Sequence, residues 1–499
     1  MAEQMGGPEK VARQHDAGRL TVRERIDLLL DPGSFREVGA IAGRARYDGG
    51  DLVEFSPANF VLGRGRIDGR PVVVGGDDFT VRGGAADGAV GGKQMYAEKM
   101  AGELRIPIVR LVDGSGGGGS VKSLESMRRT YVPADPSWQY VVDNLATIPV
   151  VALALGSVAG QGAARVATSH YAVMVRGTSQ IFVAGPPLVA RVGEDIDKEG
   201  LGGSHVHARN GVVDDAVDDE REATERARRF LSYLPSSVFE LPPRVSPYDD
   251  PHRRDDWLLS AIPRNPRQAY RIRPIVESVV DRGSFFEIGR EWGRSAVTGF
   301  ARLDGWPVAV LASDVFFYGG SWTAEAAQKV SRLVDLADTF HLPVVHIVDQ
   351  PGFLIGSAGE HAGTIRHGAR ALAAIYQASV PWCSVLVRRV FGIAGAAHQN
   401  AARFAMRFAW PSGEWGSLPL AGGIEAAYKS ELAAADDRAA RLAEIEAQLS
   451  AVRSPIRTAE AFGVEDIIDP RDTRSMLCEF AELAAPLRVP GPTCRPIRP

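Results

Sequence analysis

Short apolar runs and amphipathic segments alternate along most of this 499-residue chain. The apolar runs have the composition of strands that are buried on both faces. Clear examples are 71–76 (PVVVGG), 106–113 (IPIVRLVD), 307–313 (PVAVLAS) and 343–349 (PVVHIVD). Segments 92–104 and 325–340 have helical composition and separate such runs. This alternation predicts an α/β fold with a largely parallel, buried sheet.

The same pattern occurs twice. Residues 31–39 (DPGSFREVG) return as 281–289 (DRGSFFEIG), at an offset of 250 positions. Farther along, the offset becomes 236 and later 232, while the order of the matched residues is kept. Pairs at an offset of 236 are Asp68 with Asp304, Asp78 with Asp314, Lys93 with Lys329 and Asp113 with Asp349. Ordered matches with small insertions indicate a duplicated domain.

Each half contains a strand-like run that turns through small residues into an alanine-rich segment, at 148–175 and at 380–408. The turns are Ala159-Gly160-Gln161-Gly162 and Phe391-Gly392-Ile393-Ala394. A strand that passes through glycine into a helix leaves backbone N–H groups without intrahelical partners. Those groups, with the helix dipole behind them, suit an oxyanion.

A charged, proline-containing segment at 246–257 separates the halves and is interpreted as a linker. We therefore expect an N-terminal domain at 1–245 and a C-terminal domain at 258–499. Within the latter, 424–455 predicts one long helix that ends at Pro455. The tail beyond Leu487 lacks periodicity and is expected to fray or to lie along a neighbour.

Composition and charge narrow the function classes. The chain has 57 Lys and Arg against 61 Asp and Glu, a net charge of −4, which argues against a general nucleic-acid binder. Its three cysteines lie far apart and suggest neither a disulfide framework nor a zinc site. The start lacks a signal-peptide pattern, and no run of about 18 apolar residues could span a membrane. A soluble, cytoplasmic protein is expected.

Several candidate sites remain open at this stage. The glycine-rich loop at 111–123 can cradle phosphate or serve only as a turn, and no nucleotide P-loop motif accompanies it. His205 and His207 lack a ligand set of familiar spacing, which disfavours a metal site. Glu360 and His361 can form an acid–base pair, or Glu360 can simply favour a helix start. Two oxyanion turns without a clear nucleophile suit enolate chemistry, with the base supplied by a cofactor.

Ordered motifs in both halves resemble the carboxyltransferase subunits of biotin-dependent acyl-CoA carboxylases, of the propionyl-CoA carboxylase β type. The motifs lie at 77–93, 178–214, 229–235, 348–372 and 465–474. The resemblance runs from about Leu20 to about Leu487. It implies two duplicated crotonase-like (ClpP/crotonase) domains, each a ββα-type spiral. It also implies a homo-oligomer, a trimer of dimers, in which acyl-CoA is held by the N-terminal half and biotin by the C-terminal half of another subunit.

The resemblance also implies roles for the two turns. Gly160 and Gln161 would hold the enolate oxygen of the thioester, and Gly392 and Ile393 the ureido oxygen of biotin. Further CoA-side positions are Gly83, Gly84, Ser115, Gly116, Gly117 and Ala159. Further biotin-side positions are Phe391, Ala394, Gly319 and Gly320. Carboxyl transfer then proceeds through an enolate, and no metal is bound by the chain.

Gln161 stands where the family usually has a second glycine, and the sequence departs from the family pattern at two further places. The first glycine loop lacks the arginine of the usual SGGAR motif. The second turn reads FGIAGA where the family usually has FGGAYD, so Ile393 replaces a glycine and Ala396 an acidic residue that the family uses in acyl-group selection. Because of these departures, the sequence does not identify which acyl-CoA is the substrate.

Three functions follow from the resemblance. The first is a carboxyltransferase subunit that works with a separate biotin carboxylase and biotin carboxyl carrier, since the chain has no AMKM-like biotin attachment site. The alternatives are an acyl-CoA decarboxylase of the same family and a non-catalytic assembly subunit.

Overall fold

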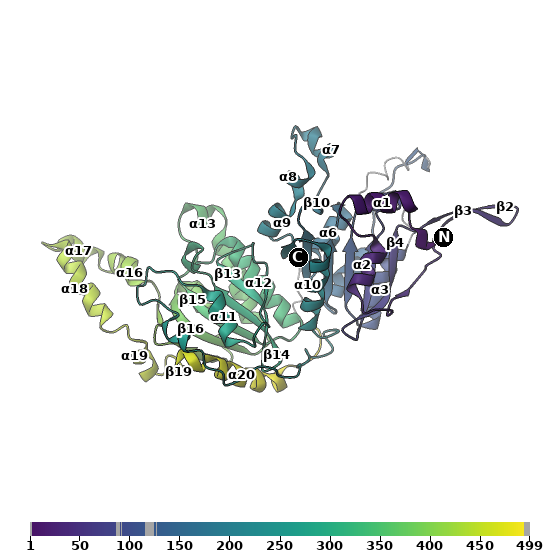
Figure 1. Cartoon of the computed structure of the whole chain (residues 1–499). Helices are drawn as coiled ribbons and strands as arrows, with labels where there is room; N and C mark the ends of the chain where they lie inside the picture. The colour runs from purple at the N-terminus through teal and green to yellow at the C-terminus, as the bar shows by residue number, and fades with distance from the viewer. Residues whose placement is uncertain (1, 86–89, 91, 115–123, 126, 494–499) are drawn as a thin grey trace. The chain divides into compact units, whose positions relative to one another are not determined.

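The computed structural model describes residues 2–85, 90, 92–114, 124–125 and 127–493. The chain forms two compact units (Figure 1), of which one spans Met1–Leu241 with the chain from Pro490 on, and the other Pro242–Val489. The segment interpreted as a linker, 246–257, is bonded within the second unit. There Arg253 pairs with Asp249 at 3.2 Å, and the carbonyl of Asp250 accepts from Nε of Arg474 at 2.8 Å.

The first unit is built on one mixed sheet with strand order β1-β4-β5-β6-β7-β9-β11. Its first two pairings are antiparallel and the rest are parallel. The strands are β1 (Arg36–Glu37), β4 (Phe60–Ile67), β5 (Arg70–Asp77), β6 (Ile108–Val112), β7 (Val150–Ala154), β9 (Tyr171–Val175) and β11 (Asp215–Val217). A small second sheet pairs β8 (Ser157–Ala159) with β10 (Gln180–Phe182).

Helices cover this sheet. They include α1 (Pro8–Asp16), α2 (Val22–Leu29), α3 (Lys93–Leu104), α5 (Ser137–Leu145), α6 (Gln161–Ala167), α7 (Pro186–Val189), α8 (Lys198–Gly202), α9 (Ser204–Asn210) and α10 (Glu220–Ser232). Buried side chains of β4 to β7 pack on α3 and α5 in one apolar cluster that includes Leu62, Val73 and Ile108. Helices α2 and α10 contact each other, and α10 also contacts β7 and β9.

The second unit repeats this plan with strand order β12-β13-β14-β15-β16-β17-β19, and β18 pairs with β16. Its strands are β12 (Phe286–Ile288), β13 (Ala296–Leu303), β14 (Trp306–Ser313), β15 (Val344–Gln350), β16 (Trp382–Phe391), β17 (Met406–Ala409), β18 (Glu414–Gly416) and β19 (Asp466–Ile467). Its helices include α11 (Ile272–Val279), α12 (Ala324–Thr339), α13 (Ser357–His361), α14 (Thr364–Gln377), α15 (Gly392–Ala396) and α20 (Thr473–Ala484). The predicted strands at 71–76, 106–113, 307–313 and 343–349, and both predicted helices, are confirmed.

Equivalent side chains make equivalent contacts in the two units, which confirms the duplication. Arg23 at the start of α2 pairs with Glu37 of β1 at 2.9 Å. At an offset of 250, Arg273 of α11 pairs with Glu287 of β12 at 2.5 Å. Each pair fixes the helix that precedes the edge strand of a unit's sheet on that strand.

A second shared contact joins the beginning of each unit to a late helix. Asp31, just after α2, accepts from Arg228 of α10 at 3.2 Å. Asp281, just after α11, accepts from Arg474 of α20 at 2.8 Å. Each aspartate also accepts from the two backbone N–H groups of the turn between the following long strands, at Asp68 and Gly69 or at Asp304 and Gly305. We call these contacts the first and second clamp.

A hairpin of β2 (Gly43–Asp48) and β3 (Asp51–Pro57) distinguishes the first unit (Figure 1). In the second unit the chain runs from β12 to β13 through the short segment 289–295. The hairpin therefore accounts for the change of offset from 250 to 236 between the halves.

The prediction of one long helix at 424–455 is wrong. The chain forms α16 (Leu420–Ala427), α17 (Lys429–Ala434) and α18 (Arg438–Ser450), and Pro455 begins α19 (Pro455–Glu460). The break has two causes. The carboxylate of Asp437 accepts from the N–H groups of Ala439 and Ala440, both at 3.0 Å, and so caps a new helix. Ile424, Leu432 and Ile445 then pack together in a small apolar cluster, which a straight helix would not allow.

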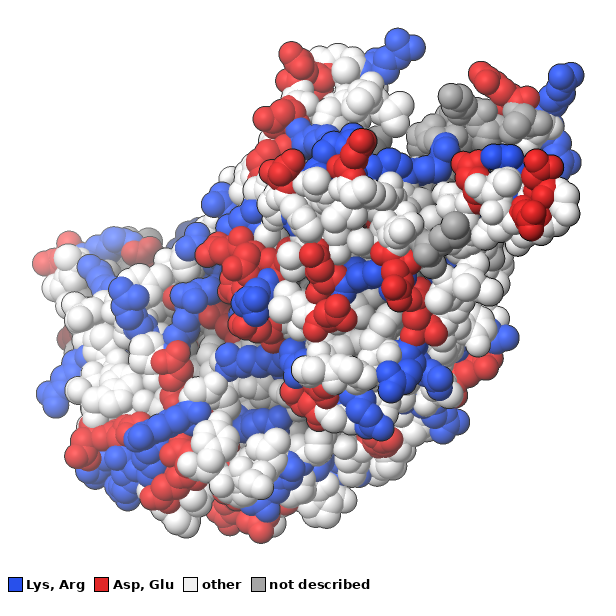
Figure 2. All heavy atoms as spheres, turned by 45° about the vertical axis from the view of Figure 1, so that its right-hand side comes forward, with Lys and Arg blue, Asp and Glu red and all other residues white. Residues whose placement is uncertain are grey.

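Figure 2 shows a face on which acidic and basic side chains are interspersed. No helix among the described residues is long and apolar enough to cross a membrane. Near the end of the chain, the N–H of Gly491 donates to the carbonyl of Val238 at 2.7 Å, so this part of the tail lies along its own first unit.

Candidate active site

The candidate residues of the first unit follow the carboxyl ends of three neighbouring strands. Gly83 and Gly84 follow β5, Gly114 follows β6, and Gly160 comes after β7 and β8. Because β5, β6 and β7 are parallel neighbours, the loops that follow them leave the same edge of the sheet. Gly114 has a φ of 96°, and a methyl group on it would lie 2.4 Å from the carbonyl oxygen of Gly83. Gly114 therefore lies against Gly83, one of the glycines predicted on the CoA side; Ser115, Gly116 and Gly117 lie outside the described residues.

The first turn places a glycine between a short strand and a helix. Ala159 ends β8 beside Phe182 of β10, and α6 begins at Gln161. Gly160, between them, has φ 60° and ψ −121°, a conformation that residues with a Cβ rarely adopt. It is exposed, and no atom lies within 4 Å of the position that a Cβ would take.

The N–H groups of the first turn differ in their bonding. That of Gly160 donates to the carbonyl of Phe182 at 3.2 Å. Those of Gln161 and Gly162, in the first turn of α6, have no acceptor within the described part of the chain. The side-chain amide of Gln161 donates to the carboxylate of Asp135. Backbone groups one and two residues after Gly160 are therefore the donors left for a ligand.

A buried group of charges holds α6 in place beneath this turn. Arg165 of α6 and Arg110 of β6 both donate to Glu98 of α3, at 2.7 and 2.8 Å. Arg110 also donates to the carbonyl oxygens of Arg165 and Thr168 near the end of α6. Burial alone would raise the pKa of Glu98, but the two arginines outweigh it and lower that pKa to about 2. The carboxylate thus stays ionised and ties α6 to the sheet.

Asp113, directly after β6, is another buried charge near this edge. It accepts from Arg25 at 2.8 Å and from the side-chain amide of Gln14 at 3.1 Å. Gly156, which follows β7, passes so close that a Cβ would lie 1.9 Å from a carboxylate oxygen of Asp113. Only glycine fits at this position, and it begins the path of the chain toward Gly160.

The candidate residues of the second unit have the same placement. Gly319 and Gly320 follow β14, and Gly392 follows β16; β14, β15 and β16 are parallel neighbours. Arg389 of β16 joins these segments, because its Nε donates to Asp349 at 2.6 Å and its Nη2 to the carbonyl of Gly319 at 2.7 Å.

Asp349 corresponds to Asp113 at the offset of 236 and is also fully buried. Its second oxygen accepts from the hydroxyl of Tyr270 at 2.8 Å. Burial, and then the charge of Asp349, raise the pKa of Tyr270 well above its usual range, so the phenol remains a donor. Both halves thus use a buried aspartate at the end of the same strand to fix the adjoining loops.

The second turn begins directly at the end of β16. Phe391 is buried and pairs with Gly416 of β18, and Gly392 has a φ of 61°. The backbone N–H groups of Gly392 and Ile393 have no acceptor among the described residues. Ala394 is buried, whereas the side chain of Ile393 is 56% exposed. The second turn therefore presents two N–H donors beside an exposed apolar side chain.

Three donors converge on one carbonyl just after α15. The carbonyl oxygen of His398 accepts from Nε1 of Trp382 at 2.8 Å, from the hydroxyl of Ser384 at 2.9 Å and from Nδ1 of His346 at 3.0 Å. Burial lowers the pKa of His346 to about 3, so its imidazole is neutral and Nδ1 carries the proton. The segment that follows the second turn is thereby fixed to β15 and β16.

The remaining candidates from the sequence, the histidine pair and the Glu–His pair, form neither a metal site nor an acid–base pair among the described residues. Nε2 of His207 bonds to the carbonyl of Ile181 at 2.8 Å, and His205 lies 3.6 Å from Glu199. Within the described ranges, no cluster of three or more possible metal ligands occurs. Glu360 and His361 are exposed on α13, and no hydrogen bond joins their side chains in the described chain.

Sequence reasoning missed Phe182, Asp135 and the His398 carbonyl. Each acts through a contact with a residue distant in sequence, and no local motif marks it. The side chains of Trp382 and Ser384 were visible only as part of an apolar strand pattern.

This chain is similar in sequence and in structure to known proteins. The model of the carboxyl transferase domain matches residues 13–492. The chain belongs to the carboxyl transferase domain family. Among curated relatives, the propionyl-CoA carboxylase carboxyltransferase subunit of Haloferax mediterranei is 36% identical, over 95% of this chain and 92% of its own. The methylmalonyl-CoA carboxyltransferase 12S subunit of Propionibacterium freudenreichii subsp. shermanii is 32% identical, over 98% and 93%.

Solved structures of carboxyltransferases share the fold. A crystal structure of transcarboxylase 12S with hydrolysed methylmalonyl-CoA aligns with a TM-score of 0.87 and 31% identity, over 98% of this chain and 95% of that one. A single-chain, multi-domain long-chain acyl-CoA carboxylase aligns with a TM-score of 0.80 and 27% identity, over 95% of this chain and 47% of that one. The predicted fold of two duplicated crotonase-like domains is confirmed.

Proposed function

We propose that this chain is the carboxyltransferase subunit of a biotin-dependent acyl-CoA carboxylase, which moves a carboxyl group from carboxybiotin to the α-carbon of an acyl-CoA. The observation that carries the proposal is the pair of strand–glycine–helix turns, one in each unit, with N–H groups that lack acceptors in the described chain. Membership of the carboxyl transferase family supports it, as do relatives named for propionyl-CoA and methylmalonyl-CoA.

On the acyl-CoA side, we assign the thioester oxygen to the turn at Gly160. Gly160 sets the direction of the chain, and the N–H groups of Gln161 and Gly162 donate to the oxygen as it gains negative charge in the enolate. Preorganised donors of this kind typically contribute about 2.7–4 kcal/mol each to transition-state stabilisation. Further CoA contacts are assigned to Gly83, Gly84, Ser115, Gly116, Gly117 and Ala159.

On the biotin side, we assign the ureido oxygen to the N–H groups of Gly392 and Ile393. Phe391 and Ala394, which stand on either side of this pair in the sequence, are both buried. Gly319 and Gly320 line its neighbour loop, which Arg389 holds. Two N–H donors without acceptors suit a carbonyl-type oxygen, so the residues present fit this group. When bound, biotin supplies the carboxyl group and the base for the α-proton.

The chain itself contributes position and dipoles. Its two turns orient two oxygens, and the buried charges at Glu98, Asp113 and Asp349 keep the supporting loops and helices rigid. Asp135 contacts the first turn through the side-chain amide of Gln161, which donates to its carboxylate; we assign the base for the α-proton to biotin.

The proposed assembly brings together the two assigned sites, the acyl-CoA side in the first unit and the biotin side in the second. We propose a homo-oligomer, a trimer of dimers, in which the first unit of one subunit and the second unit of another form each reaction site. A hexamer assembly is described for transcarboxylase 12S, and this likeness supports the proposal. Biotin would arrive on a separate carrier protein that a biotin carboxylase loads, and the cytoplasm is the proposed location.

The test is loss of the carboxyl group from malonyl-CoA, methylmalonyl-CoA and longer carboxylated acyl-CoAs, with and without free biotin. We expect loss that requires biotin, because carboxyl transfer then runs in reverse. Loss that is equal without biotin contradicts the proposal and identifies a decarboxylase. CoA-ester binding without any loss identifies an assembly subunit; the exposed Ile393 beside the second turn is the observation that keeps both alternatives in view.

A further inference from the structure

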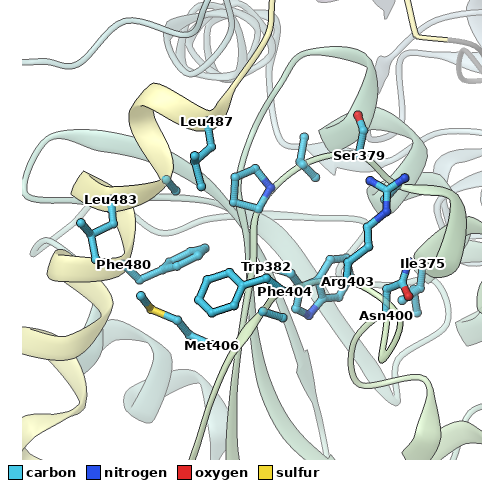
Figure 3. Close-up of a pocket in the computed structure, with 15 residues that line it drawn as sticks. Ile375, Ser379, Trp382, Asn400, Arg403, Phe404, Met406, Phe480, Leu483 and Leu487 are labelled. Atoms are coloured by element: carbon cyan, nitrogen blue, oxygen red, sulfur yellow. The ribbon is translucent and has the colours of Figure 1, made fainter.

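A cavity of about 200 Å³ opens in the second unit. Figure 3 shows the side chains that line it. It lies at the amino ends of β16 and β17, whereas Gly392 follows the carboxyl end of β16. The end of α14 and the last turns of α20 complete its wall. Its lining includes Ser379, Trp382, Asn400, Arg403, Phe404, Met406, Phe480, Leu483 and Leu487.

The body of the cavity is apolar. Trp382 and Phe480 are buried at 5% and 4% exposure and form its inner wall. Phe404 is 83% exposed, and Leu483 and Leu487 are also exposed. Figure 3 shows Trp382, Phe404 and Phe480 across the centre of the cavity, with Arg403 extending along the side on which Ser379 lies. The exposed side chains leave much apolar area to be covered.

Arg403 is the charged residue of this lining, which contains no Asp or Glu. Within the described chain, no carboxylate pairs with its guanidinium group. The neighbouring polar groups are already engaged, since Ser379 donates to Asp338 at 2.8 Å and the side-chain amide of Asn400 donates to the carbonyl of Tyr376 at 2.8 Å. A guanidinium with free donors beside an apolar cavity suits a ligand with an anionic head and an apolar body.

The cavity volume limits the size of that body. An apolar cavity of roughly 150 Å³ holds benzene in a well-studied case, so the present cavity has room for a somewhat larger group. We propose that it binds a monocarboxylate with an unbranched apolar chain of medium length, with the carboxylate on Arg403 and the chain among Trp382, Phe404 and Phe480. The proposal does not depend on the proposed function.

The ligand would contact the strand that leads to the second turn. Trp382 is the first residue of β16, and its Nε1 donates to the carbonyl of His398, two residues beyond α15. The site is nevertheless separate from the biotin-side residues, none of which lines the cavity.

The experiment is calorimetric titration of the full chain with octanoate, 1-octanol and octylammonium, which share one apolar chain. We expect saturable binding of octanoate, weaker binding of octanol and none of octylammonium. In Arg403→Gln, octanoate affinity should fall at least tenfold, to that of octanol, while octanol affinity stays unchanged. Arg457→Gln, at an exposed position on α19, is the matched control and should bind octanoate as the parent does.

A second variant separates the chain contact from the charge contact. Phe404→Ala removes an exposed ring without disturbing the core, and should weaken octanoate and octanol alike. The proposal is overturned if octanoate shows no saturable binding, or if Arg403→Gln binds it as tightly as the parent. It is also overturned if Leu483→Asp lowers the mass of the assembly, because the face is then an interface between copies.

Discussion

The backbone N–H of Gly160 donates to the carbonyl oxygen of Phe182 at 3.2 Å. At the equivalent position of the second unit, the N–H of Gly392 has no acceptor in the described chain. Two turns with one sequence plan thus offer different atoms to a ligand. The first offers the N–H groups of Gln161 and Gly162, and the second offers those of Gly392 and Ile393.

Replacement of Gly160 by valine should abolish most turnover. A β-branched residue does not adopt its φ of 60°, so the chain shifts and the N–H of Gln161 turns away from the thioester oxygen. Loss of one such donor lowers kcat by about 10²–10³-fold. Gly177→Val is the matched control, because Gly177 also has a positive φ of 72° and open space for a Cβ but lies outside the candidate site. A folded Gly160→Val protein with undiminished turnover would rule out our assignment.

Replacement of Ile393 by glycine should improve the use of free biotin. The isoleucine is 56% exposed beside the two donors of the second turn, so its removal opens the approach to them. Because the side chain packs little, the variant should lose no more than about 1 kcal/mol of stability, the usual cost of glycine in a helix. Biotin-dependent loss of carboxyl from malonyl-CoA should show a several-fold lower KM for biotin, with kcat little changed. An unchanged KM would mean that Ile393 does not limit access.

The two clamps should differ in strength. In the second clamp Arg474 and Asp281 are almost completely buried, at 1% and 0% side-chain exposure. Arg474→Gln leaves the buried carboxylate of Asp281 with two backbone N–H donors but without its cation, and should cost about 3–5 kcal/mol of unfolding free energy.

In the first clamp Arg228 and Asp31 are each 27% exposed, so Arg228→Gln should cost up to about 1 kcal/mol. Urea unfolding of the two variants measures both values. Equal losses would show that burial does not set the difference between the clamps.

Glu98 should make stability depend on acid pH. Its pKa is lowered from 4.5 to about 2, because Arg110 and Arg165 outweigh the opposing effect of burial. A carboxyl group with a lowered folded-state pKa stabilises the protein above its unfolded-state pKa, and that contribution is lost as pH falls from 4.5 toward 2. The amount is on the order of 3 kcal/mol.

Glu98→Gln lacks this contribution at every pH. We therefore expect the difference in unfolding free energy between parent and variant, measured with urea at pH 7, 5 and 3.5, to be smallest at pH 3.5. A constant difference would place the pKa of Glu98 in the folded state near its ordinary value.

The strands and the duplication were predictable because their signals are local. Val72 to Val74 and Val344 to Ile347 are buried on both sides, and such runs indicate strands without knowledge of their neighbours. The strand-turn-helix plan around Gly160 and Gly392 was predictable for the same reason.

The bonding of the first turn was not predictable. Phe182 reaches Gly160 only because β8 and β10 pair, and the sequence around residue 182 has no feature that selects this partner. The prediction of one long helix at 424–455 was wrong for a related reason. Its composition is helical throughout, but the cap at Asp437 and the packing of Leu432 against Ile445 fold it back on itself. Long-range contacts override local propensity in both cases.

The two clamps indicate how the duplicated domain arose. Because Asp31 with Arg228 and Asp281 with Arg474 occupy matching places, the contact is older than the duplication that made this gene. A single copy of this domain would then already have joined its beginning to a late helix. Because the two turns lie in separate copies, a substitution in one leaves the other unchanged, and the residue after the glycine is Gln161 in the first turn and Ile393 in the second.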